Sequence, residues 1–566
     1  MKRKLLYMTL CIIMVLSLAL SSCTTESDNS STVTGDDTTT STSDRDPVTL
    51  TLWLPCEDGT TEEAVQAVED AINDILKSSY TTAVELKVFS EDEYAEAVEA
   101  RLAVIEAKAE ADAESEEASR VQAAADRKAG VTTTTSETTE AEETEAETVT
   151  NEYGISELKY PEVDDYQFDI FLITSYDDYL ELIDRDALSV LDTYLSGDSK
   201  ILKSYIYPTF LTAAKNNGAT YCIPNNHGLG EYKFLLVNKE LAEKYDYDYT
   251  TLTTIAQCED FIYDVNTYED SSEVAALLSW VDAAGMTYWS EDGDWSVLAS
   301  LVTNSSTFNT KSSIGSIFDI SAYKSQFKMM KAFEEAGCIA GDADSVETFA
   351  VGVISGDYSD IAEYEDDYYV SIYEYPKATQ EDVFAASFAV SSYTADLDRA
   401  MEVIVEINTN SEIRNLLQYG IEGTNYQLDD DGKVVRLNNE YMMNILYTGN
   451  TYVAYPEEDM DINQWEYDKQ KNTDSILSPF LYVNGLRNSS NASYYTQIET
   501  LSAEIYEQLM SISLEEVDDK FKEFNSLIAE NEYFAAMVSD EDWEYGAAYI
   551  YSEFYAENYA TEEEAE

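Results

Sequence analysis

The fold of this chain is most constrained by a near-continuous apolar run at Phe168–Ile173. A strand with one wet face alternates apolar and polar residues, whereas an unbroken apolar strand is typical of a parallel sheet that helices cover on both faces. Upstream, the patterns at Val48–Trp53 and Val84–Phe89 predict two more strands, with a helix between them at Thr61–Lys77. This order of strand, helix and strand predicts an α/β fold.

Length and composition allow a large core. With 566 residues, of which 44% are hydrophobic, the chain can bury apolar surface in more than one lobe. Shorter strands are predicted at Thr220–Ile223, Phe234–Val237 and Val383–Val390. After about Ser493 the pattern indicates three helices, followed by the acidic tail Glu562–Glu566.

A biased segment interrupts the body after the second strand. Residues Glu91–Lys128 are rich in Ala and Glu and should form a helix. Val131–Val149 is mostly Thr and Glu without a basic residue, which is typical of low-complexity disorder. We interpret the pair as a solvated insertion on a surface loop. On that interpretation, deleting Ala95–Val149 would leave the thermal stability of the body nearly unchanged.

The first two dozen residues indicate export. Three basic residues at 2–4 precede a short apolar run, Leu5–Leu20, which is typical of a secretory signal rather than a spanning helix. The run ends in Leu20-Ser-Ser-Cys23, which resembles the bacterial lipobox and implies a lipidated, palmitate-bearing Cys23; an ordinary signal peptide is the alternative. Residues 24–46 are mostly Ser, Thr, Asp and Gly, and we expect them to form a flexible tether.

The charge balance excludes two classes of partner. Lys and Arg total 33 against 112 Asp and Glu, for a formal net charge of −79. Such a chain repels phosphate backbones, so we expect no nucleic-acid binding. It also lacks the basic patch that anionic lipid attracts, which leaves the lipid on Cys23 as the expected membrane anchor.

Side chains for catalysis or metal binding are scarce apart from carboxylates. The single histidine, His227, excludes a multi-His metal centre and leaves little room for a Ser-His-Asp triad, so we expect it to hold backbone in its loop. No Gly-rich phosphate loop follows a predicted strand. We therefore expect no catalytic residue, no metal and no cofactor. The body's four widely spaced cysteines should be free or buried thiols: Cys56, Cys222, Cys258 and Cys338.

Several segments together carry a family resemblance. Asn217-Gly-Ala-Thr-Tyr-Cys-Ile-Pro224, followed by Leu235-Leu-Val-Asn-Lys-Glu-Leu241, resembles the signature of extracellular solute-binding proteins of carbohydrate-type ABC importers. Tyr179–Asp192 is similar to that family's transition from a helix into a turn. Ile407–Leu417 and Tyr419–Tyr426 are similar to a Gram-positive lipoprotein subgroup of these family 1-like proteins. The resemblance runs from about Val48 to Asp474, and the Ala/Glu insertion and the acidic, Tyr-rich body depart from it.

The resemblance implies a periplasmic-binding-protein-like fold of class II, in which two α/β lobes flank a ligand cleft and move about a hinge. The implied organisation is a signal and lipidation site at 1–23, a tether at 24–46, a two-lobe domain at 47–500 with its insertion at 91–150, and C-terminal helices at 501–566. The implied function is capture of a carbohydrate, which we expect to be an oligosaccharide, for ABC permease subunits. The protein would work as a monomer on the extracellular face of the cell membrane.

Candidate ligand residues follow from where the predicted strands end, because open α/β sheets bind ligands at the carboxyl ends of their strands. Aromatic faces can stack on sugar C–H surfaces, and planar polar groups can bond sugar hydroxyls. The candidates are Trp53, Glu57, Tyr176, Asp177, Asn225, Asn226, His227, Glu231, Tyr232, Tyr364, Glu365, Tyr373 and Tyr426.

Two other function classes remain open from the sequence. A surface-anchored carbohydrate-active enzyme would need a cleft with two carboxylates, one of them with a raised pKa. A structural or adhesive surface protein would use the acidic helical insertion instead and would lack a deep pocket between lobes.

Overall fold

The computed structural model describes residues 45–128, 148–150, 156–216, 218–278, 289–290, 298–300, 314–340, 346, 348–477, 492–532 and 535. The chain divides into two compact units, Met1–Asp44 and Arg45–Glu566. The first unit, which contains the predicted signal and Cys23, lies outside the described residues, as do Val131–Glu147 of the low-complexity segment and the acidic tail. The second unit contains both lobes of the fold.

The first lobe is built on a five-stranded sheet in the order β2-β1-β5-β17-β8. β1 pairs in parallel with both β2 and β5, and β17 is antiparallel to its two neighbours, β5 and β8. The apolar run predicted as a buried strand contains β5, whose four residues are all buried. The strands are β1 (Val48–Cys56), β2 (Thr82–Ser90), β5 (Ile170–Ile173), β8 (Cys222–Pro224) and β17 (Ser387–Val390).

Several helices of the first lobe begin where apolar spacing and a capping residue coincide. In α2, Thr61 accepts a hydrogen bond from the Ala64 amide at 3.2 Å, and Val68, Ile72 and Leu76 are buried at helical spacing. The predicted helix at Thr61–Lys77 is thereby confirmed. The helices are α2 (Glu62–Tyr80), α4 (Tyr176–Asp184), α5 (Asp192–Ser196), α6 (Leu202–Tyr205), α7 (Pro208–Ala213), α12 (Gln380–Phe384), α13 (Leu397–Thr409) and α14 (Ser411–Tyr419).

One predicted strand is wrong in its first half. The segment Val383–Val390 splits into the end of α12 and the strand β17. Thr379 and Asp382 form a capping box, in which each side chain satisfies the other's backbone amide and starts a helix ahead of the apolar residues.

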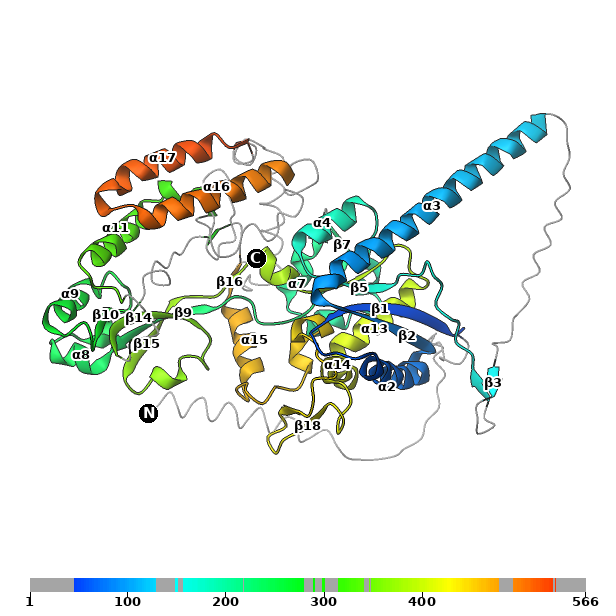
Figure 1. Ribbon diagram of the computed structural model, residues 1–566, viewed down its shortest axis with the longest axis horizontal. Coiled ribbons are helices and arrows are strands. Elements are labelled where there is room, and N and C mark those ends of the chain that lie inside the picture. Colours follow the sequence, from blue (N-terminus) through cyan, green and yellow to red (C-terminus); the bar gives the residue numbers. More distant parts are fainter. Residues whose placement is uncertain are drawn as a thin grey trace, which may run out of the picture. The chain divides into compact units, whose positions relative to one another are not determined.

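The second lobe has its own four-stranded sheet, in the order β10-β14-β9-β15, and a separate core around Leu235, Phe261 and Val351. β9 is antiparallel to β14 and β15, whereas β10 is parallel to β14. The elements are β9 (Tyr232–Asn238), α8 (Lys239–Lys244), α9 (Glu259–Tyr268), β10 (Ala275–Leu277), α11 (Ser321–Glu335), β14 (Phe349–Gly356) and β15 (Tyr368–Glu374). Figure 1 shows α8 and α9 beside this sheet.

Two C-terminal helices, α16 (Ala492–Ser511) and α17 (Val517–Ala529), confirm the first part of the predicted helical tail. The third predicted helix lies largely outside the described residues. α17 packs through aromatic rings against α11 and the residues just before it: Phe521 lies 4.8 Å from Phe318 and 5.7 Å from Tyr323.

The helix α3 (Glu91–Lys128) has the predicted bounds, but the surface-loop interpretation is wrong for its first part. Leu102 is fully buried and Ile105 is 4% exposed, both in the core of the first lobe. Arg185 of the lobe forms ion pairs with Glu99 at 2.6 Å and Glu106 at 3.0 Å. The apolar residues recur at helical spacing within an Ala/Glu background, so one face can pack although the average composition is polar. Figure 1 shows α3 continuing outward as one helix.

The remaining elements are short. They are β3 (Thr148–Thr150), β4 (Ser156–Leu158), β6 (Lys215–Asn216), β7 (Ala219–Thr220), η2 (Tyr249–Thr251), β11 (Trp289–Ser290), β12 (Leu298–Ser300), β13 (Ile314–Ser316), η4 (Ile317–Asp319), η6 (Ala362–Tyr364), β16 (Lys377–Ala378), β18 (Tyr426–Leu428), β19 (Val434–Arg436), η7 (Ile445–Thr448), η8 (Thr451–Val453), α15 (Gln464–Asp474), β20 (Ile476–Leu477) and η9 (Leu514–Glu516).

Candidate functional site

The carboxyl ends of β1, β2, β5 and β8 meet at one edge of the first sheet, because these four strands run in the same direction. This is the edge at which open α/β sheets bind ligands. Glu57 follows β1 and is exposed, Glu91 follows β2 and is exposed, and Asn225 follows β8 and is buried.

A segment from much later in the chain crosses this edge. We call residues 440–452 the edge segment. The Glu57 amide donates to the Met442 carbonyl at 3.0 Å, and at the other end the Asn225 side-chain amide donates to the Leu446 carbonyl at 2.7 Å. The edge segment therefore joins the loop after β1 to the loop after β8.

The middle of the edge segment carries a half-buried tyrosine, Tyr447. Burial raises the pKa of its hydroxyl, and the charge of Glu91 raises it further, which places Tyr447 near the loop after β2. An aromatic ring thus lies beside carboxylates at the carboxyl edge.

A cavity of about 620 Å³ lies between the turn that joins β18 to β19 and the loop before α15. Its lining combines carboxylates, one ammonium group and two apolar side chains, and it includes Ser359 from the loop after β14 of the second lobe. Lys433 donates to the Glu458 and Met460 carbonyls and so holds the loop that forms one wall. The lining residues are Ser359, Asp431, Lys433, Asp459, Met460, Asp461 and Ile462.

Glu457 connects the cavity wall to the end of β1. Burial raises the pKa of its carboxyl group; Arg436, whose Nη2 lies 3.6 Å from Glu457 Oε1, opposes the rise, and the charges of Asp459 and Glu57 add to it. Glu57, directly after β1, is thus one of the charges that act on Glu457.

The helix α15 connects both lobes at the chain crossing. From its first turn, Gln464 donates to Asp357 Oδ2, at the end of β14, at 2.5 Å. From its last turns, Asn472 donates to the His227 carbonyl at 2.9 Å. The helix approaches the crossing so closely that a Cβ on Gly228 would lie 2.7 Å from Asp468 Oδ1, so only glycine fits there without rearrangement.

Trp53 does not end its strand, as the sequence pattern indicated, because β1 continues to Cys56. Its side chain is 4% exposed and belongs to the core of the first lobe. The indole stacks on Phe89 with ring centroids 5.1 Å apart and meets the edge of Phe168 at 5.2 Å.

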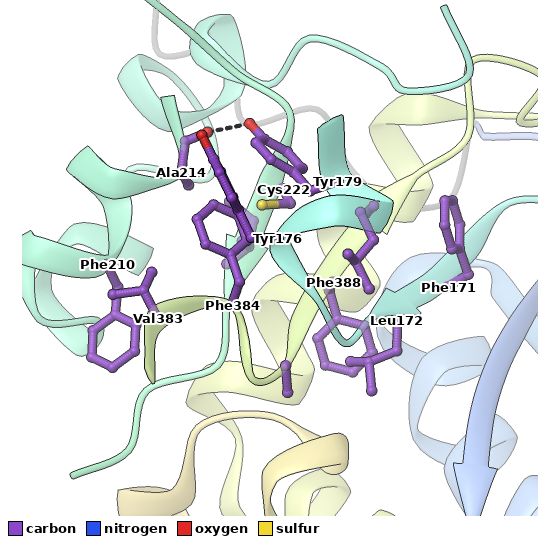
Figure 2. Close-up of a cluster of buried hydrophobic side chains, with 14 of the residues drawn as sticks. Phe171, Leu172, Tyr176, Tyr179, Phe210, Ala214, Cys222, Val383, Phe384 and Phe388 are labelled. Atoms are coloured by element: carbon purple, nitrogen blue, oxygen red, sulfur yellow. Dashed lines mark hydrogen bonds between the residues drawn. The ribbon is translucent and has the colours of Figure 1, made fainter. Parts of the chain in front are cut away.

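Three predicted tyrosines are also core residues. Tyr176 is 6% exposed, and its ring packs 5.0 Å from Phe384; Figure 2 shows both in one cluster with Tyr179, whose hydroxyl donates to the Ala214 carbonyl. Tyr232 is fully buried and donates to Asp474 Oδ2 at 2.7 Å. Tyr426 is 5% exposed.

The loop after β8 is buried and holds backbone. The Asn226 side chain accepts from the Tyr207 amide at 3.1 Å and donates to the Tyr205 carbonyl at 3.0 Å. His227 Nδ1 lies 2.8 Å from the Asn225 carbonyl, and burial lowers the pKa of the imidazole. These contacts match the backbone-holding role expected of His227.

The remaining candidates are dispersed. Tyr364 and Glu365 lie near Asn238 and Tyr368, at the end of the second sheet opposite Tyr232, which is about 20 Å away along β9 at the usual rise per residue. Tyr373 accepts from Gln326 of α11 at 2.9 Å and packs on the second core. Asp177 and Glu231 are exposed. Of the thirteen candidates, Glu57 is the one linked by a charge interaction to the cavity wall.

Local sequence patterns do not directly mark the edge segment or the cavity. Gly432, at φ +82°, closes the hairpin that carries Asp431 and Lys433, and the Asp-Gly turn pattern is the feature that could have identified it. The link between residues 57 and 442 is a tertiary contact that local patterns do not reveal.

Other classes of site find little support within the described residues. They contain no group of three or more His, Cys, Asp or Glu placed to hold a metal ion. Their four cysteines are free and buried, as expected. No helix in the described part of the chain has the length and apolar character needed to cross a membrane.

A sequence relative binds substrates for a carbohydrate transporter, although no protein-family model matches the chain. This relative, a carbohydrate ABC transporter substrate-binding protein of Streptococcus pneumoniae, is 23% identical over 329 residues, which cover 54% of this chain. The match spans 65% of that relative, slightly less than two thirds of its length.

The fold is shared with a solved structure. The N-glycan transport solute-binding protein NgtS of S. pneumoniae superposes with a TM-score of 0.54 at 15% identity, covering 91% of this chain and all of NgtS. NgtS in complex with Man5GlcNAc gives a TM-score of 0.43 at 15% identity and the same coverage. The expected two-lobe α/β solute-binding fold is confirmed.

Proposed function

We propose that this chain, a relative of the substrate-binding proteins of carbohydrate ABC transporters, captures an oligosaccharide and delivers it to membrane permease subunits. The observation that carries the proposal is the cavity of about 620 Å³ between the β18–β19 turn and the loop before α15, with Ser359 of the second lobe in its lining. Ligand sites in proteins have volumes of about 300–1,000 Å³.

The chemistry of the lining favours a polyhydroxylated ligand. Carboxylates accept hydrogen bonds from sugar hydroxyls, and Met460 and Ile462 supply apolar contact for C–H faces. Aromatic side chains lie close by in sequence and space: Trp465 donates from its indole N–H to the Ala454 carbonyl at 3.0 Å, and its ring lies 6.2 Å from Tyr452. We propose Glu57, Tyr447 and the cavity residues as the ligand-binding set, in place of the buried candidates.

We further propose that the protein works on the extracellular face of the membrane, anchored by lipid on Cys23. The lipobox-like ending Leu20-Ser-Ser-Cys23 and the polar tether after it support this location.

A thermal-shift screen tests the binding proposal. The purified protein is melted alone and with maltose, cellobiose, chitobiose or oligomannose glycans such as Man5GlcNAc, the ligand named for NgtS. A glycan that binds only the folded state raises the melting temperature as its concentration rises. Absence of any shift with all of these glycans at millimolar concentration, and with an acidic oligosaccharide added to the screen, would reject carbohydrate capture.

A carbohydrate-active enzyme is the second candidate, and one observation favours it. Burial raises the pKa of Glu457, with Glu57 and Asp459 close enough to add to the rise, and a carboxylate pair with one raised pKa is the requirement for glycoside hydrolysis. Against it, Glu457 is ion-paired with Arg436. Each glycan that binds is therefore incubated with the protein and assayed for reducing ends. Release that Glu457→Gln abolishes would establish the enzyme.

A further inference from the structure

The helix α14 has a buried polar face that the ligand site does not itself use. Arg414, Asn415, Gln418 and Tyr419 are spaced i, i+1, i+4 and i+5, which places them on one side of the helix. All four are buried. They lie within the Ile407–Tyr426 region that resembles a lipoprotein subgroup.

Each of these side chains bonds the edge segment or the residues just after it. Gln418 donates to the Met443 carbonyl at 2.7 Å. Asn415 accepts from the Tyr455 amide at 2.9 Å, and Tyr419 donates to the Tyr455 carbonyl at 2.6 Å. The face of α14 therefore fixes the path of the chain along the carboxyl edge.

Arg414 makes more of these bonds than any other side chain on this face. Its Nη2 donates to the Ile445 carbonyl at 2.8 Å, its Nη1 to Thr448 Oγ1 at 2.6 Å, and its Nε to the Asn450 carbonyl at 3.1 Å. A fourth bond, from Nη1 to Gln418 Oε1 at 3.3 Å, stays within α14. One guanidinium group thus holds three positions of the edge segment.

The free-energy cost of burying the Arg414 guanidinium is high for a purely structural contact. Arg414 is fully buried, and no described carboxylate forms an ion pair with it; burial lowers its pKa to about 10. Burying an unpaired charge is unfavourable, and apolar residues of similar volume often stabilise such a position better. What the guanidinium adds is a fixed geometry of several hydrogen bonds at once.

The backbone conformation of the edge segment allows it to pack closely against Arg414. Gly449 has φ +111°, which favours glycine, and a Cβ there would lie 2.6 Å from Ile407 Cγ2 and 3.4 Å from Arg414 Cδ. Beyond Gly449, the Thr451 amide donates to the Asn226 carbonyl at 2.9 Å. The positions that Arg414 fixes are therefore continuous with the chain crossing.

We propose that Arg414 is a positioning residue for ligand binding: it touches no ligand, but it holds the edge segment, and through it the crossing at Asn225 and Asn226, in the arrangement that the ligand requires. The inference rests on the proposed carbohydrate function.

The test compares two buried arginines at opposite ends of the same sheet. Arg399 of α13 is 3% exposed and donates to Tyr80 and Thr82 at the amino end of β2, far from the carboxyl edge. Arg414→Met and Arg399→Met each remove one buried guanidinium while keeping an unbranched side chain. Both should lower the melting temperature, but only Arg414→Met should weaken glycan affinity, by about tenfold, because the edge segment is then no longer held in its binding arrangement.

Affinity is measured by calorimetry well below both melting temperatures, with the glycan that gives the largest shift for the unchanged protein. Equal affinity in the two variants would overturn the positioning role, whereas failure of the unchanged protein to bind any glycan would overturn the proposed function instead. If Arg414→Met does not fold, Thr448→Val removes one acceptor of Arg414 within the edge segment. Unchanged affinity together with unchanged amide exchange of residues 440–452 in that variant would also reject the proposal.

Discussion

At the scale of single residues, burial separates structural side chains from candidate ligand contacts. Trp53 fits between Phe89 and Phe168, and the guanidinium of Arg101 lies 5.3 Å from the centroid of its ring. Its indole nitrogen has no hydrogen-bond partner among the described residues, so its contribution is packing rather than polar recognition.

Trp53→Ala should therefore destabilise the fold by about 3–5 kcal/mol, the usual cost of emptying a large buried aromatic site. Glycan affinity of the molecules that remain folded should stay within about twofold, because the side chain lies in the core. Urea unfolding and calorimetry on the same variant check both expectations. A stable variant with weakened glycan affinity would show that Trp53 belongs to the binding site.

His227 should make stability depend on pH in a defined window. Burial lowers its pKa below the usual 6.5, so the unfolded chain takes up the proton first as pH falls. The neutral imidazole makes its full contribution to the free energy of unfolding above about pH 6.5, and this contribution is lost as pH falls from there towards the folded-state pKa. Between about pH 7.5 and about pH 5.5, the melting temperature of the unchanged protein should thus fall further than that of the His227→Gln variant.

His227 is the single histidine of the chain, so its imidazole titration can be followed directly by nuclear magnetic resonance. A measured pKa at or above 6.5 would contradict the buried neutral state and with it the pH window.

At the scale of elements, local patterns predicted the strands of the first sheet, strand β9 of the second sheet and several helices, because alternation, helical spacing and caps are properties of neighbouring residues. The exception at Val383–Val390 arose where a capping box competed with an apolar run. The pattern also could not reveal that Tyr94, Leu102 and Ile105 of α3 are buried, because the surface that covers them comes from distant parts of the lobe.

Two apolar residues on α3 differ in burial and so check how this helix packs. Leu102 is fully buried, whereas Val104, two residues on, is 51% exposed. Leu102→Ala should cost about 2–5 kcal/mol of unfolding free energy, and Val104→Ala should stay within about 0.5 kcal/mol. Equal, small effects in urea titrations would restore the interpretation of α3 as a solvated insertion.

At the scale of the whole molecule, the α/β class could be predicted from the order of strands and helices, and the two lobes from the family resemblance. The binding site could not be predicted residue by residue. Its proposed residues come from positions 57, 359, 431–433, 447 and 459–462, and the part that lines the cavity is brought together from three separate stretches of the chain. Of the residues chosen from sequence, Glu57 stays in the proposed set because it directly follows a strand and is exposed, whereas the tyrosines were selected from a chain with 44 of them, most of which can serve as core.

Calorimetric titration of charge-matched variants measures whether the cavity lined by residues 431–433 and 459–462 binds an oligosaccharide. Asp431→Asn with Asp459→Asn removes two lining carboxylates, and Asp430→Asn with Glu458→Gln removes two exposed neighbours that do not line the cavity. The unchanged protein and the neighbour pair should bind one glycan per chain with affinities within about twofold, and the cavity pair should bind about tenfold or more weakly. Equal affinity of the two paired variants would mean that the cavity is not the oligosaccharide-binding site.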